Sequence, residues 1–456
     1  HIINHSESVF LFVSDRIWDT LEEEMIEDVR GVFSLSDFRC LHQRDGESIQ
    51  KLLKGMDEKM AEKYPDGFGK DDIEYAELDN DKVVLLNYTS GTTGFSKGVM
   101  LTGNNLAGNV MYGIELGVLY RGERELCFLP LAHAYSCAFN FLVPMAVGAH
   151  VYLLGKVPSP KILLKAFEEV NLILTVPLIL EKIYKKMILP QLSKTTMKVA
   201  LNIPLLDSRI YAQIRKKLVD AFGGRFREVI VGGAAMNEEV TNFLYKIKFP
   251  FTIGYGMTEC GPLISYDHND EYVPGSCGQI LKGIMKVRID SEDPYNKVGE
   301  IQVSGENVMK GYYKNEEATS KVFTEDGWLR TGDLGTIDAD NRIYIRGRSK
   351  TMILGASGQN IYPEEIESKL NNLPFVMESI IIEKNGKLVG LVYPDYDTVD
   401  STGISHEDLP IIMEQNRIEL NKLLAPYEAV SALQLYPTEF EKTPKKSIKR
   451  YLYSNY

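Results

Sequence analysis

A stretch rich in hydroxyl and glycine residues, 88–98, has the composition of a loop that holds phosphate. Glycine adopts positive φ without steric cost, so such a loop can aim several backbone N–H groups at one anion. The spacing differs from that of a Walker A loop, because Ser96 stands where the second glycine belongs and Gly98 follows the lysine. A flexible linker is the alternative, but the stretch lies between a strand-like run and a helix start. The residues expected to contact phosphate are Thr89, Ser90, Gly91, Thr92, Thr93, Gly94 and Lys97.

A second stretch, GYGMTE at 254–259, places a tyrosine, a threonine and a carboxylate in close succession. It is not a dinucleotide fingerprint, because Glu259 stands where a third glycine would be required. Mg²⁺ prefers one or two carboxylates together with phosphate oxygens, and a carboxylate here suits that chemistry. The alternative is a solvated Thr-Glu pair at the start of a helix.

The elements that must position these motifs alternate between strand and helix from residue 8 to about residue 248. Apolar runs at 150–154, Leu172–Val176 and Glu228–Val231 predict strands. One predicted helix begins at Ser159 and Pro160, and another is capped by Asn237. This alternation predicts an α/β fold, with a large N-terminal domain of mostly parallel sheets flanked by helices.

The character of the chain changes beyond Gly278. Short strands are expected at 286–289, 300–303 and 342–345, separated by turn residues, which predicts a small β-rich subdomain. After Arg348 a compact tail begins, with a helix opened by Pro363. We therefore expect a large domain at 1–348 and a small, mobile C-terminal α+β domain at 349–456.

The composition limits the class of protein. Apolar residues make up 44% and charged residues 25%, as in a soluble globular protein. The net charge of −12 argues against a general nucleic-acid binder. The five cysteines are scattered without a C-x-x-C pair, so neither a disulfide framework nor a zinc site is indicated. We expect a cytoplasmic protein.

The stretch at 88–98 resembles the signature loop of the adenylate-forming superfamily, which contains acyl-CoA ligases, peptide-synthetase adenylation domains and luciferases. Its one departure is Ser96, where the family usually has proline. Further motifs follow in the family's order from Thr89 to Arg450. The long-chain fatty acyl-CoA ligase branch is the most similar, through LPLAHAYS, VSGENVMKGYYKN and TPKKSIKRYLY.

The resemblance assigns roles to residues of the expected nucleotide site. Tyr255 would stack on adenine next to Gly256 and Met257, Thr258 would bond the phosphate, and Glu259 would bind Mg²⁺. Gly233, Ala234 and Ala235 would lie against adenine, Asp333 would bind the ribose, and Arg348 would contact the nucleotide. Lys350 would be the hinge, Gly358 would lie in the pantetheine tunnel, and His133 would lie beside the acyl site. For each of these residues a purely structural role, such as a tight turn, is the alternative.

The resemblance implies a reaction in two steps that uses ATP, Mg²⁺ and CoA. The carboxylate of a fatty acid attacks the α-phosphorus of ATP, and the CoA thiol then attacks the acyl carbon of the adenylate. No nucleophilic side chain is needed, so Cys260 is expected only to line the pocket. A fatty-acid substrate is compatible with peripheral membrane contact. The alternatives are an enzyme that loads a carrier protein and a nucleotide-binding homologue without turnover.

The C-terminal motif departs from the family. A lysine in the family's T-P-x-x-K-x-x-R motif serves adenylation, but here Ser447 stands at that place. On an extended strand Lys449 would share the face of Ser447, about 6.6 Å further along. Lys449 is therefore the first candidate for this role, and Lys446 is the second if a bulge shifts the register.

The start of the chain also differs from expectation. The first residue is His1, and an apolar strand-like run at 9–13 follows almost at once. From the resemblance and from typical domain sizes, we expect roughly a hundred residues of the large domain to precede it.

Overall fold

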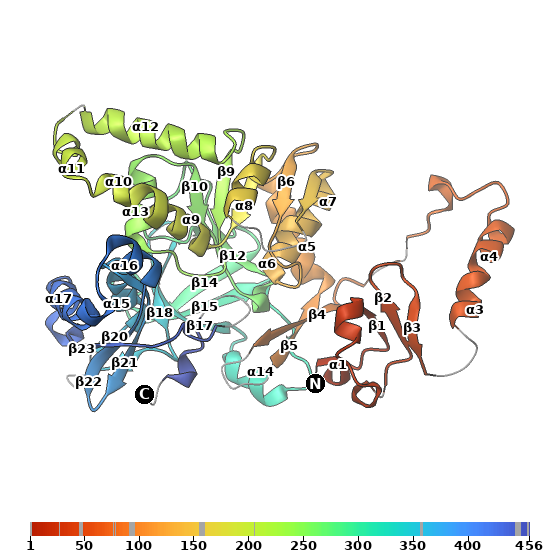
Figure 1. Cartoon of the computed structure of the whole chain (residues 1–456). Helices are drawn as coiled ribbons and strands as arrows, with labels where there is room; N and C mark the ends of the chain where they lie inside the picture. The colour runs from red at the N-terminus through yellow and green to blue at the C-terminus, as the bar shows by residue number, and fades with distance from the viewer. Residues whose placement is uncertain are drawn as a thin grey trace.

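The computed structural model describes residues 2–26, 28–44, 49–75, 77, 79–90, 96–154, 160–204, 206–355, 359–442, 448–453 and 456. A five-stranded sheet lies at the centre of the large body, with every pair of neighbouring strands parallel (Figure 1). Its strands, in spatial order, are β10 (Phe251–Ile253), β9 (Glu228–Val231), β8 (Leu172–Thr175), β6 (Arg124–Cys127) and β7 (His150–Leu153).

Helices cover this sheet, and two of its inner strands are buried at every position as a result. Strands β8 and β9 have no exposed residue, as expected for a parallel sheet with both faces covered. Large aromatic side chains such as Phe167 and Phe222 are fully buried and stacked, with their ring centroids 5.4 Å apart. The covering helices include α8 (Pro160–Phe167), α9 (Pro177–Ile183), α12 (Leu206–Ala221) and α13 (Glu238–Lys246).

The predicted alternation of strands and helices is confirmed here. Asn237 caps α13, and its Oδ1 accepts a hydrogen bond from the Val240 amide at 3.3 Å. Pro160 begins α8, as expected, whereas Ser159 lies outside the described residues. Pro177 was expected only to end the preceding strand, and it also begins α9, since its missing N–H is not needed in the first turn.

A second group of elements packs beside the parallel sheet. Strands β4 (Val83–Ser90), β5 (Ser96–Thr102) and β16 (Gly311–Tyr312) form an antiparallel sheet with β5 in the middle. Helix α5 (Gly103–Glu115) follows β5 directly, and Thr102 caps it through a hydrogen bond from the Asn105 amide. Short strands β11 (Tyr255–Gly256), β12 (Leu263–Tyr266) and β13 (Gln279–Ile280) continue from the parallel sheet.

The predicted β-rich subdomain is a four-stranded antiparallel sheet. Its strands are β14 (Met285–Asp290), β15 (Gly299–Gly305), β17 (Leu329–Ile337) and β18 (Ile343–Arg348). Three of them match the predicted strands, and β17 was not foreseen. Strand β17 carries the WLRTGD motif from Leu329 onward, so the expected ribose-binding carboxylate lies on a strand.

The C-terminal part of the chain has its own core (Figure 1, blue). It contains α15 (Pro363–Leu370), β19 (Ile353–Leu354), β20 (Asn360–Ile361), β21 (Val376–Lys384), β22 (Lys387–Pro394), α16 (Tyr396–Thr402), α17 (Leu409–Lys422) and β23 (Val430–Leu435). Among the described residues, its apolar clusters begin at Ile353, whereas those of the large body end at Ile345. Polar bonds connect the two bodies, since Lys185 Nζ donates to the Asn371 carbonyl at 2.6 Å.

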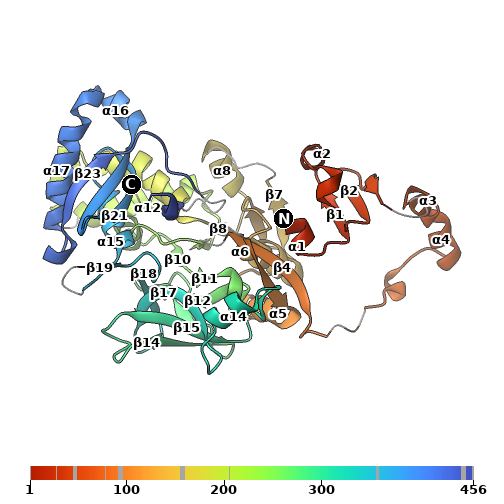
Figure 2. The same ribbon diagram turned by 90° about the horizontal axis from the view of Figure 1, so that it is seen from below.

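A separate three-stranded sheet near the N-terminus stands to one side of the large body in both views (Figures 1 and 2). Strand β1 (Phe10–Val13) matches the predicted apolar run and pairs in parallel with β2 (Gly31–Ser34), which pairs with β3 (Cys40–Gln43). Helices α3 (Ile49–Lys54) and α4 (Met56–Lys63) extend beyond it. Within the described parts of the chain, no helix is long and apolar enough to cross a membrane.

Candidate active site

The predicted phosphate loop connects the antiparallel strands β4 and β5. Thr89 pairs with Lys97 and Ser90 pairs with Ser96, so the two strands stay in register up to the loop. The predicted loop residues Gly91, Thr92, Thr93 and Gly94 lie outside the described residues. The pairing nevertheless fixes Lys97 at the base of the loop, on the central strand of its sheet.

Lys97 and Glu259 meet around a tyrosine that sequence reasoning missed. The Lys97 Nζ atom lies 4.6 Å from the centroid of the Tyr312 ring. The Tyr312 hydroxyl donates to Glu259 Oε1 at 2.9 Å. Burial, with the Glu259 charge beside it, raises the pKa of Tyr312 far above its usual range, so the hydroxyl stays protonated. The cluster therefore joins the predicted phosphate lysine to the predicted metal carboxylate.

The turn that carries Glu259 is held from several sides. Residues Thr258–Cys260 form a single 3-10 turn. The Met309 amide donates to the Glu259 carbonyl at 2.8 Å, and Asn109 Nδ2 donates to the Cys260 carbonyl at 3.3 Å. Thr258 is buried. These bonds fix the backbone of the predicted metal ligand.

Cys260 does not line an open pocket as expected, because its side chain is fully buried in the apolar core. Burial and the neighbouring Glu259 charge raise the pKa of the Cys260 thiol well above its usual value. A neutral, enclosed thiol is a poor nucleophile. The structure therefore assigns this cysteine to packing.

Asp333, the predicted ribose ligand, is buried and contacts the buried Tyr255 and the exposed Arg348. The Tyr255 hydroxyl donates to Asp333 Oδ2 at 2.7 Å, and Arg348 Nε lies 3.1 Å from Oδ1. The strand register brings Arg348 there, because Asp333 and Arg348 are paired on β17 and β18. Burial raises the pKa of Asp333, while the Arg348 charge and the Tyr255 hydrogen bond lower it and Glu259 raises it further.

The glycine- and alanine-rich loop follows β9 at the carboxyl edge of the parallel sheet. Gly233 has a φ of +87°, a conformation that glycine adopts readily, and Ala234 and Ala235 are exposed. Strand β10 ends at the same edge and continues into Tyr255. Ligands of open α/β sheets bind at this edge, so the loop, Tyr255, Gly256 and Met257 are suitably placed for a base.

The chemistry of Glu259 fits a magnesium ion that arrives with a nucleotide. Among the residues that the structure describes, no group of three His, Cys, Asp or Glu side chains forms a metal cage. Mg²⁺ commonly takes one or two carboxylates and completes its six ligands with phosphate oxygens and water. The Glu259 carboxylate, which Tyr312 links to Lys97 at the base of the loop, can supply one such ligand.

The C-terminal candidates are placed only in part. Lys449 Nζ lies 3.1 Å from Glu441 Oε2. Lys442 and Ile448 form an isolated antiparallel bridge. The expectation that Lys449 shares the face of Ser447 stays a prediction, because Ser447 is not among the described residues. Lys446 and Ser447, like Gly358, lie outside the described residues.

Arg450 anchors the end of this segment to α15. Its guanidinium contacts Glu367 and lies 3.7 Å from Glu364 Oε1, which accepts a 2.6 Å hydrogen bond from Thr351. Burial raises the pKa of Glu367 to about 7, although the Arg450 charge lowers it. This cluster was not predicted from the sequence, and it connects the segment next to Lys449 with a residue directly after Lys350.

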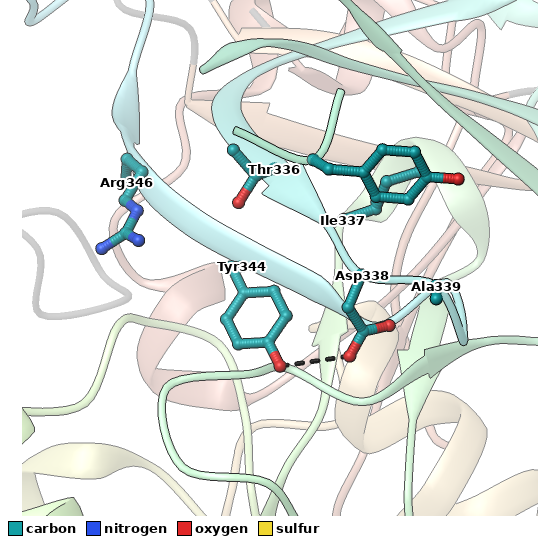
Figure 3. A pocket seen from close by; sticks show the side chains of 7 residues that line it. Thr336, Ile337, Asp338, Ala339, Tyr344 and Arg346 are labelled. Atoms are coloured by element: carbon teal, nitrogen blue, oxygen red, sulfur yellow. Dashed lines mark hydrogen bonds between the residues drawn. The ribbon is translucent and has the colours of Figure 1, made fainter. Parts of the chain in front are cut away.

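Two further features are His133 and a surface pocket. His133 is half-buried at the start of a short helix, Ala134–Ser136. A pocket on the β-rich subdomain is lined by side chains of β17 and β18, among them Thr336, Tyr344 and Arg346, with the Tyr344 hydroxyl donating to Asp338 at 3.2 Å (Figure 3). None of the predicted site residues lines that pocket.

Comparisons with known proteins identify the family of the chain. The model of the family described as "AMP-binding enzyme" matches residues 1–313. The chain is 33% identical over 319 residues to 4-coumarate-CoA ligase 1 of Narcissus pseudonarcissus, covering 66% of this chain and 53% of the relative. It is 28% identical over 498 residues to the peroxisomal long chain acyl-CoA synthetase 7 of Arabidopsis thaliana, covering 97% of this chain and 70% of the relative.

Solved structures share the fold. ATP-bound MatB from Rhodopseudomonas palustris has a TM-score of 0.73 at 22% identity, covering 100% of this chain and 80% of that one. Bacillus subtilis MenE with ATP and magnesium has a TM-score of 0.69 at 22% identity, covering 99% and 80%. The α/β fold prediction is confirmed. The chain spans little more than half of several curated relatives, between 53% and 59% of their length.

Proposed function

Since the chain belongs to the AMP-binding enzyme family, we propose that it is part of an AMP-forming acid–CoA ligase that activates a fatty acid with ATP. The observation that carries this proposal is the cluster of Lys97, Tyr312 and Glu259 at the base of the phosphate loop. It combines a cation, a fixed hydroxyl and a carboxylate next to a loop suited to phosphate. Asp333 is close enough for the Glu259 charge to raise its pKa.

Each group has a role in the first step, attack of the substrate carboxylate on the α-phosphorus. Lys97 and Thr258 stabilise negative charge on phosphate oxygens, and Thr89 to Gly94 are further proposed phosphate contacts. Mg²⁺ on Glu259 would neutralise further phosphate charge when bound. Asp333 accepts the ribose hydroxyls, with Arg348 beside the nucleotide. Charge stabilisation of this kind is usually the largest contribution to rate.

The second step, attack of the CoA thiol on the acyl carbon, requires the small domain. We place the hinge at Ser349–Lys350, between the large domain 1–348 and the small domain 349–456. Separate apolar cores on the two sides of that boundary support independent movement. Lys449 is the proposed adenylation lysine, Gly358 the proposed contact to pantetheine, and His133 a proposed contact near the acyl chain.

A fatty acid is favoured as substrate by the extent of the similarity. The match to the long chain acyl-CoA synthetases of Arabidopsis covers 92% and 97% of this chain and so includes the small domain. The second candidate is a hydroxycinnamic acid, because 4-coumarate-CoA ligases are up to 33% identical over shorter stretches. Cytoplasmic location and peripheral membrane contact remain predictions.

ATP–pyrophosphate exchange by the intact protein tests this proposal. The panel consists of straight-chain fatty acids of increasing length and 4-coumarate, and CoA is added afterwards to detect the thioester. Exchange with fatty acids followed by acyl-CoA formation is expected. Exchange only with 4-coumarate would make 4-coumarate, and not a fatty acid, the substrate. ATP binding without exchange for any acid would contradict the enzymatic function.

A further inference from the structure

Tyr312 uses two different parts of its side chain to contact the two charged groups of the site. Its hydroxyl donates to Glu259 Oε1 at 2.9 Å, while its ring lies under Lys97 Nζ at 4.6 Å from the centroid. The side chain is only 7% exposed. A cation over an aromatic face and a hydrogen bond to a carboxylate both strengthen when water is excluded.

The backbone around Tyr312 is fixed independently of that contact. Tyr312 is paired with Val99 on β5, the strand that also carries Lys97. Its amide donates to Thr319 Oγ1 at 2.9 Å, from helix α14 (Glu316–Val322). At the preceding Gly311, φ is +138°, and an added Cβ would lie 2.8 Å from Thr319 Cγ2. The strand and α14 therefore determine where the ring and the hydroxyl lie.

We propose that Tyr312 is a positioning residue that orients Glu259 toward Mg²⁺ and Lys97 toward the nucleotide phosphates. A carboxylate has about four acceptor sites, so one bond from Tyr312 fixes its orientation and leaves capacity for a metal. Hydrogen-bond partners of metal ligands commonly change metal affinity by about 10–100-fold. This inference rests on the proposed site, and it concerns binding as well as turnover.

Tyr313 provides a matched control on the same segment. Its hydroxyl also donates to a glutamate, Glu7, and its ring also lies near a lysine, Lys314, at 5.5 Å from the centroid. Glu7 and Lys314 are exposed and form an ion pair, and Tyr313 is half-buried. Tyr313→Phe therefore removes an equivalent hydroxyl outside the site.

The experiment measures ATP binding to the intact protein by calorimetry across a Mg²⁺ titration. Tyr312→Phe keeps the ring and should raise the Mg²⁺ concentration for half-maximal tight binding by about 10-fold or more, with metal-free ATP binding unchanged. Tyr312→Leu should also weaken metal-free binding a few-fold, because Lys97 loses its aromatic partner. In a Glu259→Gln background, Tyr312→Phe should have no further effect on the Mg²⁺ requirement.

An unchanged Mg²⁺ requirement in Tyr312→Phe would overturn the inference, as would an equal change in Tyr313→Phe. Thermal melting of Tyr312→Phe and Tyr313→Phe checks that both variants fold. Because Tyr312→Phe removes only one oxygen atom, it still tests the inference if Tyr312→Leu does not fold. The Mg²⁺ requirement for ATP binding is measured independently of turnover. A shifted Mg²⁺ requirement without adenylation of any acid would retain the inference and refute the proposed reaction.

Discussion

Replacing Glu367 by glutamine should remove a pH dependence of stability that arises in the small domain. The carboxyl is buried, its Oε1 accepts from the Ile381 amide at 2.6 Å, and Arg450 contacts it. Burial raises its pKa from 4.5 to about 7. The folded state therefore binds a proton between these pH values that the unfolded state releases, so the free energy of unfolding falls as pH rises through this window.

The size of this effect follows from the two pKa values. A difference of about 2.5 corresponds to about 3 kcal/mol over the whole window, at about 1.36 kcal/mol for each pKa unit. Between pH 5 and pH 8 the contribution amounts to about 2.5 kcal/mol. Glutamine does not titrate, so wild type should lose this amount relative to Glu367→Gln over that range. Loss of the contact with Arg450 also changes the free energy of unfolding of Glu367→Gln, by an amount that does not depend on pH.

Urea unfolding of both proteins between pH 5 and pH 8, followed by circular dichroism, measures the difference. Glu383→Gln is the control, because Glu383 is exposed at the end of β21. If the difference between wild type and Glu367→Gln were the same at pH 5 and pH 8, the carboxyl would not titrate as reasoned. A difference with the opposite trend would mean that the ion pair with Arg450 outweighs burial.

Four variants test the proposed roles. Glu259→Gln should lower the rate of pyrophosphate exchange by about 10²–10³-fold with little change in melting temperature, and an unchanged rate would remove it from the metal role. Asp333→Ala should mainly weaken ATP affinity, measured as KM for ATP, because ribose contacts form before the transition state. Lys449→Ala should reduce adenylation more than thioester formation from supplied acyl-adenylate; loss in Lys446→Ala instead would assign the role to the other lysine.

Local patterns predicted most of the fold. Strand β9 and the Asn237 cap were found because a buried strand and a helix start leave continuous signals in the sequence. Strand β17 was missed because its polar and glycine residues, Thr331 to Asp333, resemble a turn. Its strand conformation depends on pairing with β15 and β18, which are distant in sequence.

The candidate site was predicted residue by residue, but the contacts within it were not. Tyr312 lies in a motif used only to establish resemblance, and its role depends on the pairing of β16 with β5. The bond between Tyr255 and Asp333 joins residues 78 positions apart in the chain. No local pattern encodes such contacts, because they arise only when separate sheets pack together.

The central claim, activation of a carboxylic acid through an acyl-adenylate, is tested most directly by isotope transfer. The intact protein is given ATP, CoA and a fatty acid labelled with ¹⁸O in both carboxyl oxygens, and the AMP is analysed by mass spectrometry. Attack of the carboxylate on the α-phosphorus, followed by thiol attack on the acyl carbon, leaves one carboxylate oxygen on phosphorus. One ¹⁸O atom is expected in each AMP formed with acyl-CoA, and unlabelled AMP would contradict this mechanism.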